Sequence, residues 1–371
     1  MTAADFAGIS NTAIAFASIV YVLAFMSHLA EWASSRGVAV GSPREVQAAG
    51  ADAPERTASA PASLVPRSAR QTRPASAVLP GAPAPTGTDA DPVEVDDGTQ
   101  RDVGAARVRV ERFGAIGVAL TVSAGFLHAV GVVTRGLGAE PARVPWGNMY
   151  EFSVAGTLGV TAFYLFLLRK YQLRWLGPLV TGFNVVVLML AVLILYEPAG
   201  PLVPALDSYW LVIHVVAAII ATGAFTVGGM ASLLFLVKER AQARGRTGSG
   251  YVARLPELAV LDRVAYRMHA FGFPIWTFAA LIAGPIWAEH AWGRYWGWDP
   301  KEVWAFITWV AYAAYLHARA TAGWKGRSAA IIALVALATL LFNFVGINFF
   351  FGASSQHSYA AGLVAAHSGL G

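Results

Sequence analysis

Residues 175 to 196 read WLGPLVTGFNVVVLMLAVLILY, a run that contains no charged side chain. A helix needs about 20 consecutive apolar residues to cross the hydrocarbon core of a bilayer, and this run has that length. Further runs of the same kind occur at 11 to 33, 113 to 134, 151 to 169, 209 to 237, 264 to 288, 302 to 320 and 328 to 351. The sequence therefore predicts an all-α, polytopic membrane helix bundle with about eight transmembrane helices.

The overall composition also indicates a membrane protein. Apolar residues make up 56% of the 371 residues and charged residues 13%, whereas soluble domains carry about 25% charged residues. The chain has no cysteine, which excludes a disulfide framework, thiol catalysis and thioether attachment of a cofactor to the chain itself. The net charge of +5 comes largely from basic residues between the apolar runs, so it is a topology signal, and we predict no nucleic-acid partner.

A segment of different composition separates the first two runs. From Ser34 to about Gly104 it is rich in Ala, Pro, Ser and Arg, as in PASLVPRSARQTRPASAVLPGAPAPTG. Such a composition cannot bury enough apolar surface to offset its ordering entropy, so we expect disorder. The first run has neither a basic segment before it nor a cleavage site after it, so we expect it to be retained. The expected parts are an N-terminal transmembrane helix at 1–35, a disordered cytoplasmic linker at 36–110 and a membrane domain at 111–360.

Basic residues set the expected orientation. All but four of the 27 lysines and arginines fall in the odd-numbered connections, and the exceptions are Arg135, Arg143, Arg294 and Lys301. Because cytoplasmic loops carry the excess of basic residues, the odd-numbered connections are expected to lie inside the cell. With an even number of helices, both termini and the loop between the sixth and seventh runs would then lie on the extracytoplasmic side.

That loop, which reads EHAWGRYWGWDPKEVW, is rich in aromatic residues. Trp292, Tyr295 and Trp296 are spaced i, i+3 and i+4, so a helical segment would place them on one face. An interfacial aromatic belt is the alternative, although a belt usually supplies one or two rings at a helix end. A flat apolar shelf for a flat ligand explains the crowding better. Two further tryptophans extend this shelf: Trp298 and Trp304.

Asp299 has a structural explanation of its own. It precedes Pro300 and stands three residues before Glu302, which is the pattern of a capping box at the start of a helix. Capping requires no ligand. It is also compatible with shaping a ligand shelf, so both roles stay open for this residue.

The eight histidines can be sorted by their depth in the predicted helices. A histidine within a membrane span is costly and so is a functional candidate, although any single one can be a buried residue bonded to a carbonyl. Two imidazoles above and below a haem make a closed six-coordinate iron site. Outer histidines beside an aromatic shelf therefore favour haem, whose propionates Arg294 and Lys301 could neutralise. The outer group is His214, His290 and His357, with His128 in the outer half of its run; the inner group is His28, His269 and His317; His367 lies in the tail.

Several motifs resemble those of a known family. WGRYWGWDP fits the WGxxWxWD signature of the WWD, or haem-handling, membrane proteins of cytochrome c biogenesis. The wider context resembles the ResC/CcsA branch of System II, called CcsB in actinobacteria, in SYWLVIHV, GFPIWTFAALIAGPIWAEHAWG, ITWVAYAAYLHAR and HSY. VPWGNMYEF is similar to the loop before that family's third helix. The resemblance covers residues 113 to 360 and implies that the membrane domain is a cytochrome c assembly (WWD) domain.

By this resemblance, the chain would be the haem-handling subunit of a System II cytochrome c synthase, with haem b as its transported substrate. His214 and His357 would be the axial pair of an outer haem. His317 would be one ligand of a second haem in the membrane, and a ResB/Ccs1-like membrane subunit would supply the other. His28 and His269 are alternative partners for His317, and a ligand role for His290 is not implied. The implied haem-binding residues are His214, His317, His357, Trp292, Gly293, Trp296, Trp298, Asp299 and Trp304.

The resemblance also implies partners, a location and a mode of action. An apocytochrome c CxxCH segment would meet the haem on the outer face of the cell (plasma) membrane, beside membrane lipid. The chain would supply no catalytic residue and would act by positioning within a haem lyase-type complex. Three alternatives stay open: a System I WWD haem-delivery protein, a cytochrome b-like electron carrier with histidine pairs at both leaflets, and a solute transporter without haem, whose helices Gly228, Gly229, Gly272 and Pro274 could interrupt.

Overall fold

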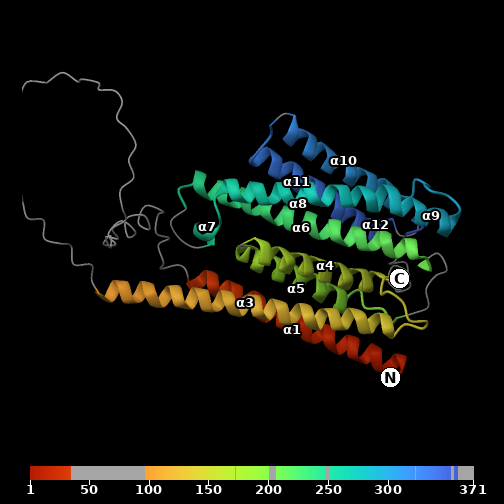
Figure 1. Cartoon of the computed structure of the whole chain (residues 1–371), viewed down its shortest axis with the longest axis horizontal. Helices are drawn as coiled ribbons and strands as arrows, with labels where there is room; N and C mark the ends of the chain where they lie inside the picture. The colour runs from red at the N-terminus through yellow and green to blue at the C-terminus, as the bar shows by residue number, and fades with distance from the viewer. Residues whose placement is uncertain are drawn as a thin grey trace, which may run out of the picture.

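A computed structural model gives the fold (Figure 1) and describes residues 1–34, 97–171, 173–199, 206–246, 251–321, 323–351 and 355–357. Every element in these described residues is helical, which confirms the all-α prediction. The elements are α1 (Ala3–Ser34), α3 (Asp97–Leu137), α4 (Met149–Lys170), η2 (Arg174–Leu176), α5 (Gly177–Leu193), α6 (Tyr209–Ala243), α7 (Tyr251–Arg254), α8 (Leu258–Phe278), η4 (Ala279–Ala283), α9 (Gly284–Trp292), α10 (Pro300–Ala320), α11 (Arg327–Leu341), η5 (Phe342–Gly346) and α12 (Ile347–Phe350).

The described helices make the chain a multi-pass membrane protein. Seven stretches are long and apolar enough to cross a bilayer: Ala3–Ser34, Gly104–Leu137, Met149–Lys170, Arg174–Leu193, Tyr209–Ala243, Leu258–Trp292 and Arg327–Phe350. They correspond to seven of the eight predicted runs. The eighth run, in α10, is less apolar because it contains tryptophan, tyrosine and histidine side chains.

Helix α10 nevertheless runs the length of the bundle. At its start, the Asp299 carboxylate accepts hydrogen bonds from Ser355 and His357, which follow α12. At its far end, Arg319 donates a hydrogen bond to Asp262 near the start of α8, with an N···O distance of 2.5 Å. Among the described residues, α10 is therefore an eighth long helix of the bundle. Its start lies beside the residues that follow α12, and its far end lies beside the start of α8.

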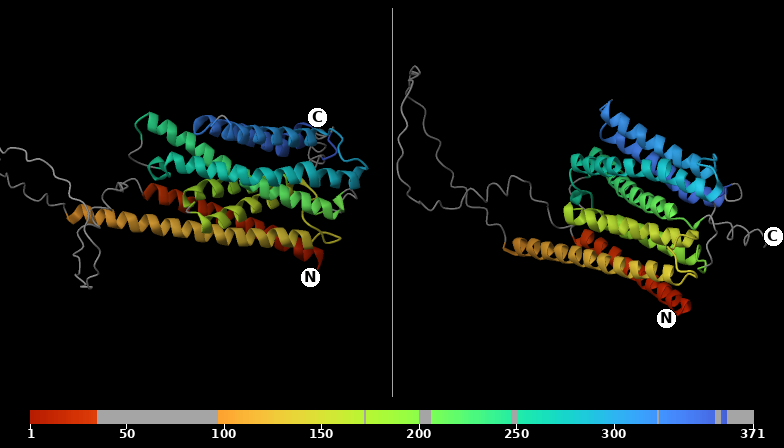
Figure 2. Two further views of the ribbon diagram at one scale, coloured as in Figure 1. Left: turned by 45° about the horizontal axis from the view of Figure 1, so that its top comes forward. Right: turned by 45° about the vertical axis from the view of Figure 1, so that its right-hand side comes forward.

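The long helices pack in pairs that are stacked on one another (Figures 1 and 2). α1 packs against α3, α4 against α5, α6 against α8 and α10 against α11. The second and third pairs meet where α4 crosses α6. Gly159 permits this close crossing, because a Cβ at that position would overlap the Ile219 side chain. The candidate site lies between these two pairs.

The beginning of α1 lies at the same end of the bundle as α9 (Figure 1). Near that end the Ser10 hydroxyl donates to the carbonyl of Gly131, at 2.7 Å, and so ties α1 to α3. Helix α3 begins at Asp97, so residues 97–110 of the expected linker are helical. The rest of the expected disordered linker lies outside the described residues, and so does His367.

Candidate functional site

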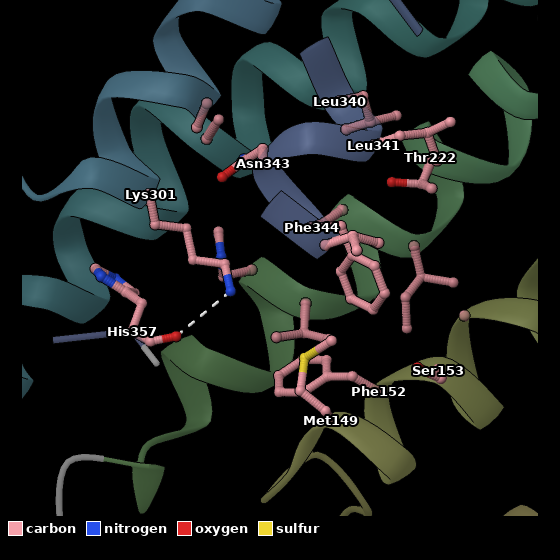
Figure 3. Close-up of a pocket in the computed structure, with 18 of the residues that line it drawn as sticks. Met149, Phe152, Ser153, Thr222, Lys301, Leu340, Leu341, Asn343, Phe344 and His357 are labelled. Atoms are coloured by element: carbon pink, nitrogen blue, oxygen red, sulfur yellow. Dashed lines mark hydrogen bonds between the residues drawn. The ribbon is translucent and has the colours of Figure 1, made fainter. Parts of the chain in front are cut away.

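A cavity of about 410 Å³ lies between the α4/α5 and α6/α8 pairs. Figure 3 shows its wall from α4, with Met149, Phe152 and Ser153, and the facing wall from α11 and η5. Most of the lining is apolar. His357 and Lys301 lie together at one end, where the Lys301 ammonium donates to the His357 carbonyl at 3.4 Å. The cavity therefore combines a long apolar chamber with a polar end.

His214, on the first turns of α6, lines this cavity. Its Nδ1–H donates to the carbonyl oxygen of Ala279 at 2.8 Å. Ala279 opens the π-helix η4, and a π-bulge is an arrangement often found at functional sites. Because a carbonyl can only accept, the bond fixes the Nδ1–H tautomer of His214 and leaves Nε2 as the nitrogen with an available lone pair.

His357 also lines the cavity and is held in the same way, by a carboxylate instead of a carbonyl. Its Nδ1 donates to Asp299 Oδ2 at 3.0 Å. Asp299 also accepts from the Ser355 hydroxyl at 2.7 Å and from the backbone N–H of Gln356 at 2.7 Å. Metal-binding histidines commonly donate their second ring N–H to a carboxylate or a carbonyl, which orients the ring. Both His214 and His357 have this arrangement.

The hydrogen bonds also determine the charge of Asp299. Burial by itself raises the pKa of this carboxyl, but hydrogen bonds from His357, Ser355 and Gln356, together with the charge of His357, lower its pKa to about 2. Asp299 therefore stays ionised near neutral pH. It also caps α10, and Glu302 completes the capping box, as the sequence indicated.

Trp287 joins the two histidines. Its ring is stacked on that of His214, with centroids 6.0 Å apart and planes at 11°. The same ring contacts His357 edge-on, with centroids 5.4 Å apart. Trp292 also contacts His357 edge-on, with centroids 4.5 Å apart. His214 and His357, which lie 143 positions apart in the sequence, thus share one indole-walled cavity.

The Trp-rich loop is not the helical face that its spacing suggested. Helix α9 ends at Trp292, because Gly293 adopts a left-handed conformation with φ of 69° and terminates it. Tyr295 and Trp296 line the cavity from the loop that follows. The segment is therefore not helical beyond Trp292, so the condition for a shared helix face is not met. The loop still brings Tyr295 and Trp296 to the cavity.

The other aromatic residues of the loop lie outside the cavity lining. Trp298 is 70% exposed and has φ of 55°, an uncommon conformation for a bulky residue. Its ring contacts Trp296 edge-on at 5.8 Å. Trp304 packs on Phe342 at 4.1 Å. Of the two basic residues of this loop, Lys301 lines the cavity, whereas Arg294 donates to Gln356 at the exposed surface.

The remaining described histidines do not line the cavity. His317 lies exposed on α10, toward the other end of the bundle. His28 and His269 are fully buried, and neither ring has a hydrogen-bond partner among the described residues. His128 is buried and bonded to Val154 and Tyr21, so it has a structural role. A hydrogen bond joins His290, half-exposed on α9, to the carbonyl of Ile286.

A buried ion cluster that the sequence did not reveal supports the α4 side of the cavity. Glu151 accepts from Arg135 Nε at 3.0 Å and from Arg143 Nη1 at 2.8 Å, and all three side chains are almost fully buried. The Gly147 N–H donates to the same carboxylate at 2.7 Å. These bonds fix the loop that leads into α4, and hence Met149 and Phe152 at the cavity.

Glu151→Gln should therefore destabilise the fold. Removing the charge leaves two buried arginines without their carboxylate, a change that costs about 3–5 kcal/mol in comparable buried pairs. We expect a clearly lower melting temperature for the purified variant in detergent. Glu289→Gln, at a half-exposed position on α9, is the matched control and should melt at the same temperature as the wild type. Equal melting of both variants would show that the cluster does not hold the loop.

Comparison with known proteins gives a consistent match. The family model described as cytochrome C assembly protein matches residues 146–353, which include His214 and the Trp-rich loop and end before His357. The cytochrome c biogenesis protein CcsA of Synechococcus sp. (strain JA-2-3B'a(2-13)) is 33% identical over 317 residues, covering 69% of this chain and 88% of the relative. CcsA of Guillardia theta is 34% identical over 237 residues, covering 59% of this chain and 78% of the relative.

Proposed function

Because the chain belongs to the cytochrome c assembly protein family and acts in cytochrome c maturation, we propose that it holds haem between His214 and His357 as the haem-handling subunit of a System II cytochrome c synthase. One observation carries this proposal: two histidines, each with its Nδ1–H bonded to an acceptor, line one cavity walled by indole rings. Such imidazoles present Nε2 for iron, and the indoles present flat apolar surface to a porphyrin.

In this proposal the chain contributes position and electrostatics. Ala279 and Asp299 orient the two axial imidazoles, and Lys301 at the cavity end would neutralise a haem propionate. An apocytochrome CxxCH segment brings two thiols. Each sulfur bonds to one carbon of a haem vinyl group while the thiol proton goes to the other carbon, so no oxidant or reductant is consumed. The histidine of that segment then displaces one of the two imidazoles.

We place the site on the extracytoplasmic side of the cell membrane. The four basic residues outside the odd-numbered connections are Arg135, Arg143, Arg294 and Lys301. All lie at the site end of the bundle, where each has a hydrogen-bonding partner. The opposite end carries the rest of the basic residues among the described segments. By the positive-inside rule that end faces the cytoplasm.

A second haem would bind at His317, with a ligand from a ResB-like subunit. His317 continues an exposed, otherwise apolar stripe on α10 that includes Phe306 and Val310. An imidazole exposed to lipid is costly, so a partner helix that covers it and shares a metal would relieve that cost. His28 and His269, the alternative partners, are buried inside the bundle, whereas His317 faces outward.

The test is to purify the chain alone and with a ResB-like subunit, and to measure haem by visible absorption and by pyridine haemochrome. We expect haem in both preparations and more haem in the complex, because the second site is completed by the partner. His317→Ala should remove the additional haem and leave the haem of the isolated chain. A colourless wild-type chain would favour a solute transporter and would overturn the proposal.

The System I haem-delivery alternative is separated by the same preparations. A delivery protein passes its haem to another carrier, whereas a synthase subunit with its partner should convert an apocytochrome to the holo form. Formation of thioether-linked haem by the purified complex supports the System II proposal. Haem binding without any thioether product would favour the delivery role.

A further inference from the structure

The interior of the bundle between the two proposed haem sites is packed. Phe225 and Tyr312 are fully buried there and stacked, with ring centroids 3.6 Å apart. The fully buried ring of His269 packs against Tyr312 at 5.3 Å and against Tyr315 at 5.0 Å. Meanwhile His317 lies on the outer surface of α10. A ligand the size of haem cannot pass through such a core without large rearrangement, since interiors pack as densely as organic crystals.

The outer cavity, by contrast, has an apolar rim at the side of the bundle. Five residues line the cavity and are also between 39% and 54% exposed on the bundle surface. They come from two segments, α5 with its C-cap and the α11–η5–α12 segment. The rim residues are Leu190, Ile194, Leu341, Val345 and Phe349.

The rim lies within the apolar part of the bundle. Leu190 belongs to the span Arg174–Leu193, and Leu341, Val345 and Phe349 belong to the span Arg327–Phe350. Each of these residues is nearer to the site end of its span than to the other end. Figure 3 shows the polar end of the cavity, with Lys301 and His357, apart from Leu341 of this rim. The cavity therefore has a lipid-facing side as well as a polar end.

We propose that haem reaches the His214 and His357 site sideways, from the outer half of the bilayer, through the opening between α5 and the α11–η5–α12 segment. This inference rests on the proposed function. Haem is flat and largely apolar, so a route along the lipid-facing surface keeps its macrocycle out of water. Passage along the surface also connects the exposed His317 with the cavity without opening the Phe225 and Tyr312 core.

The opening can be tested first without haem. The chain has no cysteine, so Gly156→Cys would place a single thiol in the cavity. A Cβ at Gly156 would meet nothing within 4 Å, so the thiol fits. In lipid nanodiscs we expect a lipid-soluble maleimide to label this thiol. Adding both Leu190→Trp and Val345→Trp to this chain gives the filled variant, in which two indole rings occupy the opening. In the filled variant the labelling of the thiol should be at least tenfold slower.

Leu193→Trp is the matched control. Leu193 lies on α5 beside Leu190 and is 72% exposed, but it does not line the cavity. The thiol of the Gly156→Cys chain that also carries Leu193→Trp should be labelled as fast as the thiol of the chain with Gly156→Cys alone. Equal labelling of the filled variant and the control would overturn the inference, and so would labelling by a water-soluble maleimide alone. Equal melting temperatures establish that the filled variant is folded.

A second measurement asks whether haem uses the opening. Haem is dissolved in the nanodisc lipid, and growth of the Soret band is followed with time. The filled variant should load at least tenfold more slowly than the Leu193→Trp control, whose substituted residue does not line the cavity. Equal loading rates would overturn the lateral route. Failure of the wild type to load any haem would instead overturn the proposed function, while the labelling result would still report on the opening.

Discussion

His214→Ala and His357→Ala are each expected to reduce the haem retained by the purified chain by roughly tenfold or more, and to abolish holocytochrome formation. Removing one axial imidazole leaves the iron with a single protein ligand. Loss of even an outer-shell partner typically costs about 10- to 100-fold in metal affinity. The haem that remains should be five-coordinate, so its Soret band should shift. Visible absorption and pyridine haemochrome of equal amounts of protein measure both effects.

Two comparisons make this prediction specific. His290→Ala removes an imidazole from α9 that does not line the cavity, so its haem content and spectrum should equal those of the wild type. Adding free imidazole to the His214→Ala or His357→Ala variant should restore the six-coordinate spectrum, since the small ligand fits the space that was vacated. An unchanged Soret band in both single variants would exclude these residues as axial ligands.

The membrane fold could be predicted from the sequence because each residue contributes its own free energy of transfer from water to lipid when a helix spans the bilayer. The run at 175 to 196 contains no charged side chain to desolvate, and α5 lies within this run. In helix α10 the composition indicates a membrane span less clearly. Its tryptophans, tyrosines and His317 lower its hydropathy, so its length and contacts, more than its composition, place it in the bundle.

The candidate site was only partly predictable. His214 and His357 were singled out by their depth relative to the predicted helices, and the structure places both at one cavity. Trp287 was not singled out, because it lies in an apolar run where an aromatic residue is unremarkable to a periodicity argument. The acceptor carbonyl of Ala279 could not be foreseen either, since a π-helix is a tertiary adjustment with no sequence signature.

The conformation of the Trp-rich loop could not be predicted from its spacing alone. Its i, i+3, i+4 spacing matches a helix, but Gly293 ends α9 in a left-handed conformation one residue after Trp292. Glycine adopts that conformation without steric cost, so it commonly terminates helices. The capping box at Asp299 was predictable because capping is local. Its bond to His357 was not, because that contact joins two segments separated by α10, α11, η5 and α12.

Asp299→Asn should separate the two roles of this residue. Asn is as good an N-cap as Asp, so α10 should keep its start and the melting temperature should change little. The amide carries no charge, however, so the bond that its oxygen accepts from the His357 Nδ1–H is weaker, and its NH2 group cannot accept the Gln356 N–H that bonds to Asp299 Oδ1. We therefore expect His357 to be held less firmly, and haem to dissociate about 10- to 100-fold faster. Transfer of haem to an excess of a soluble haem-binding protein measures that rate.

The pH dependence adds a second readout that a purely structural residue would not affect. The pKa of Asp299 is lowered to about 2, against an ordinary value of 3.8. A carboxyl group whose pKa is lowered in the folded protein stabilises it fully at pH values above the ordinary pKa. This stabilisation is lost as the pH falls toward the lowered pKa. Protonation of Asp299 should thus not accelerate haem release from the wild type until the pH falls below about 4. In the Asn variant no carboxylate is present, so release should be fast already at neutral pH. Equal release rates for the variant and the wild type at neutral pH would mean that Asp299 only caps α10, and that the orientation of His357 comes from its contacts with Trp287 and Trp292.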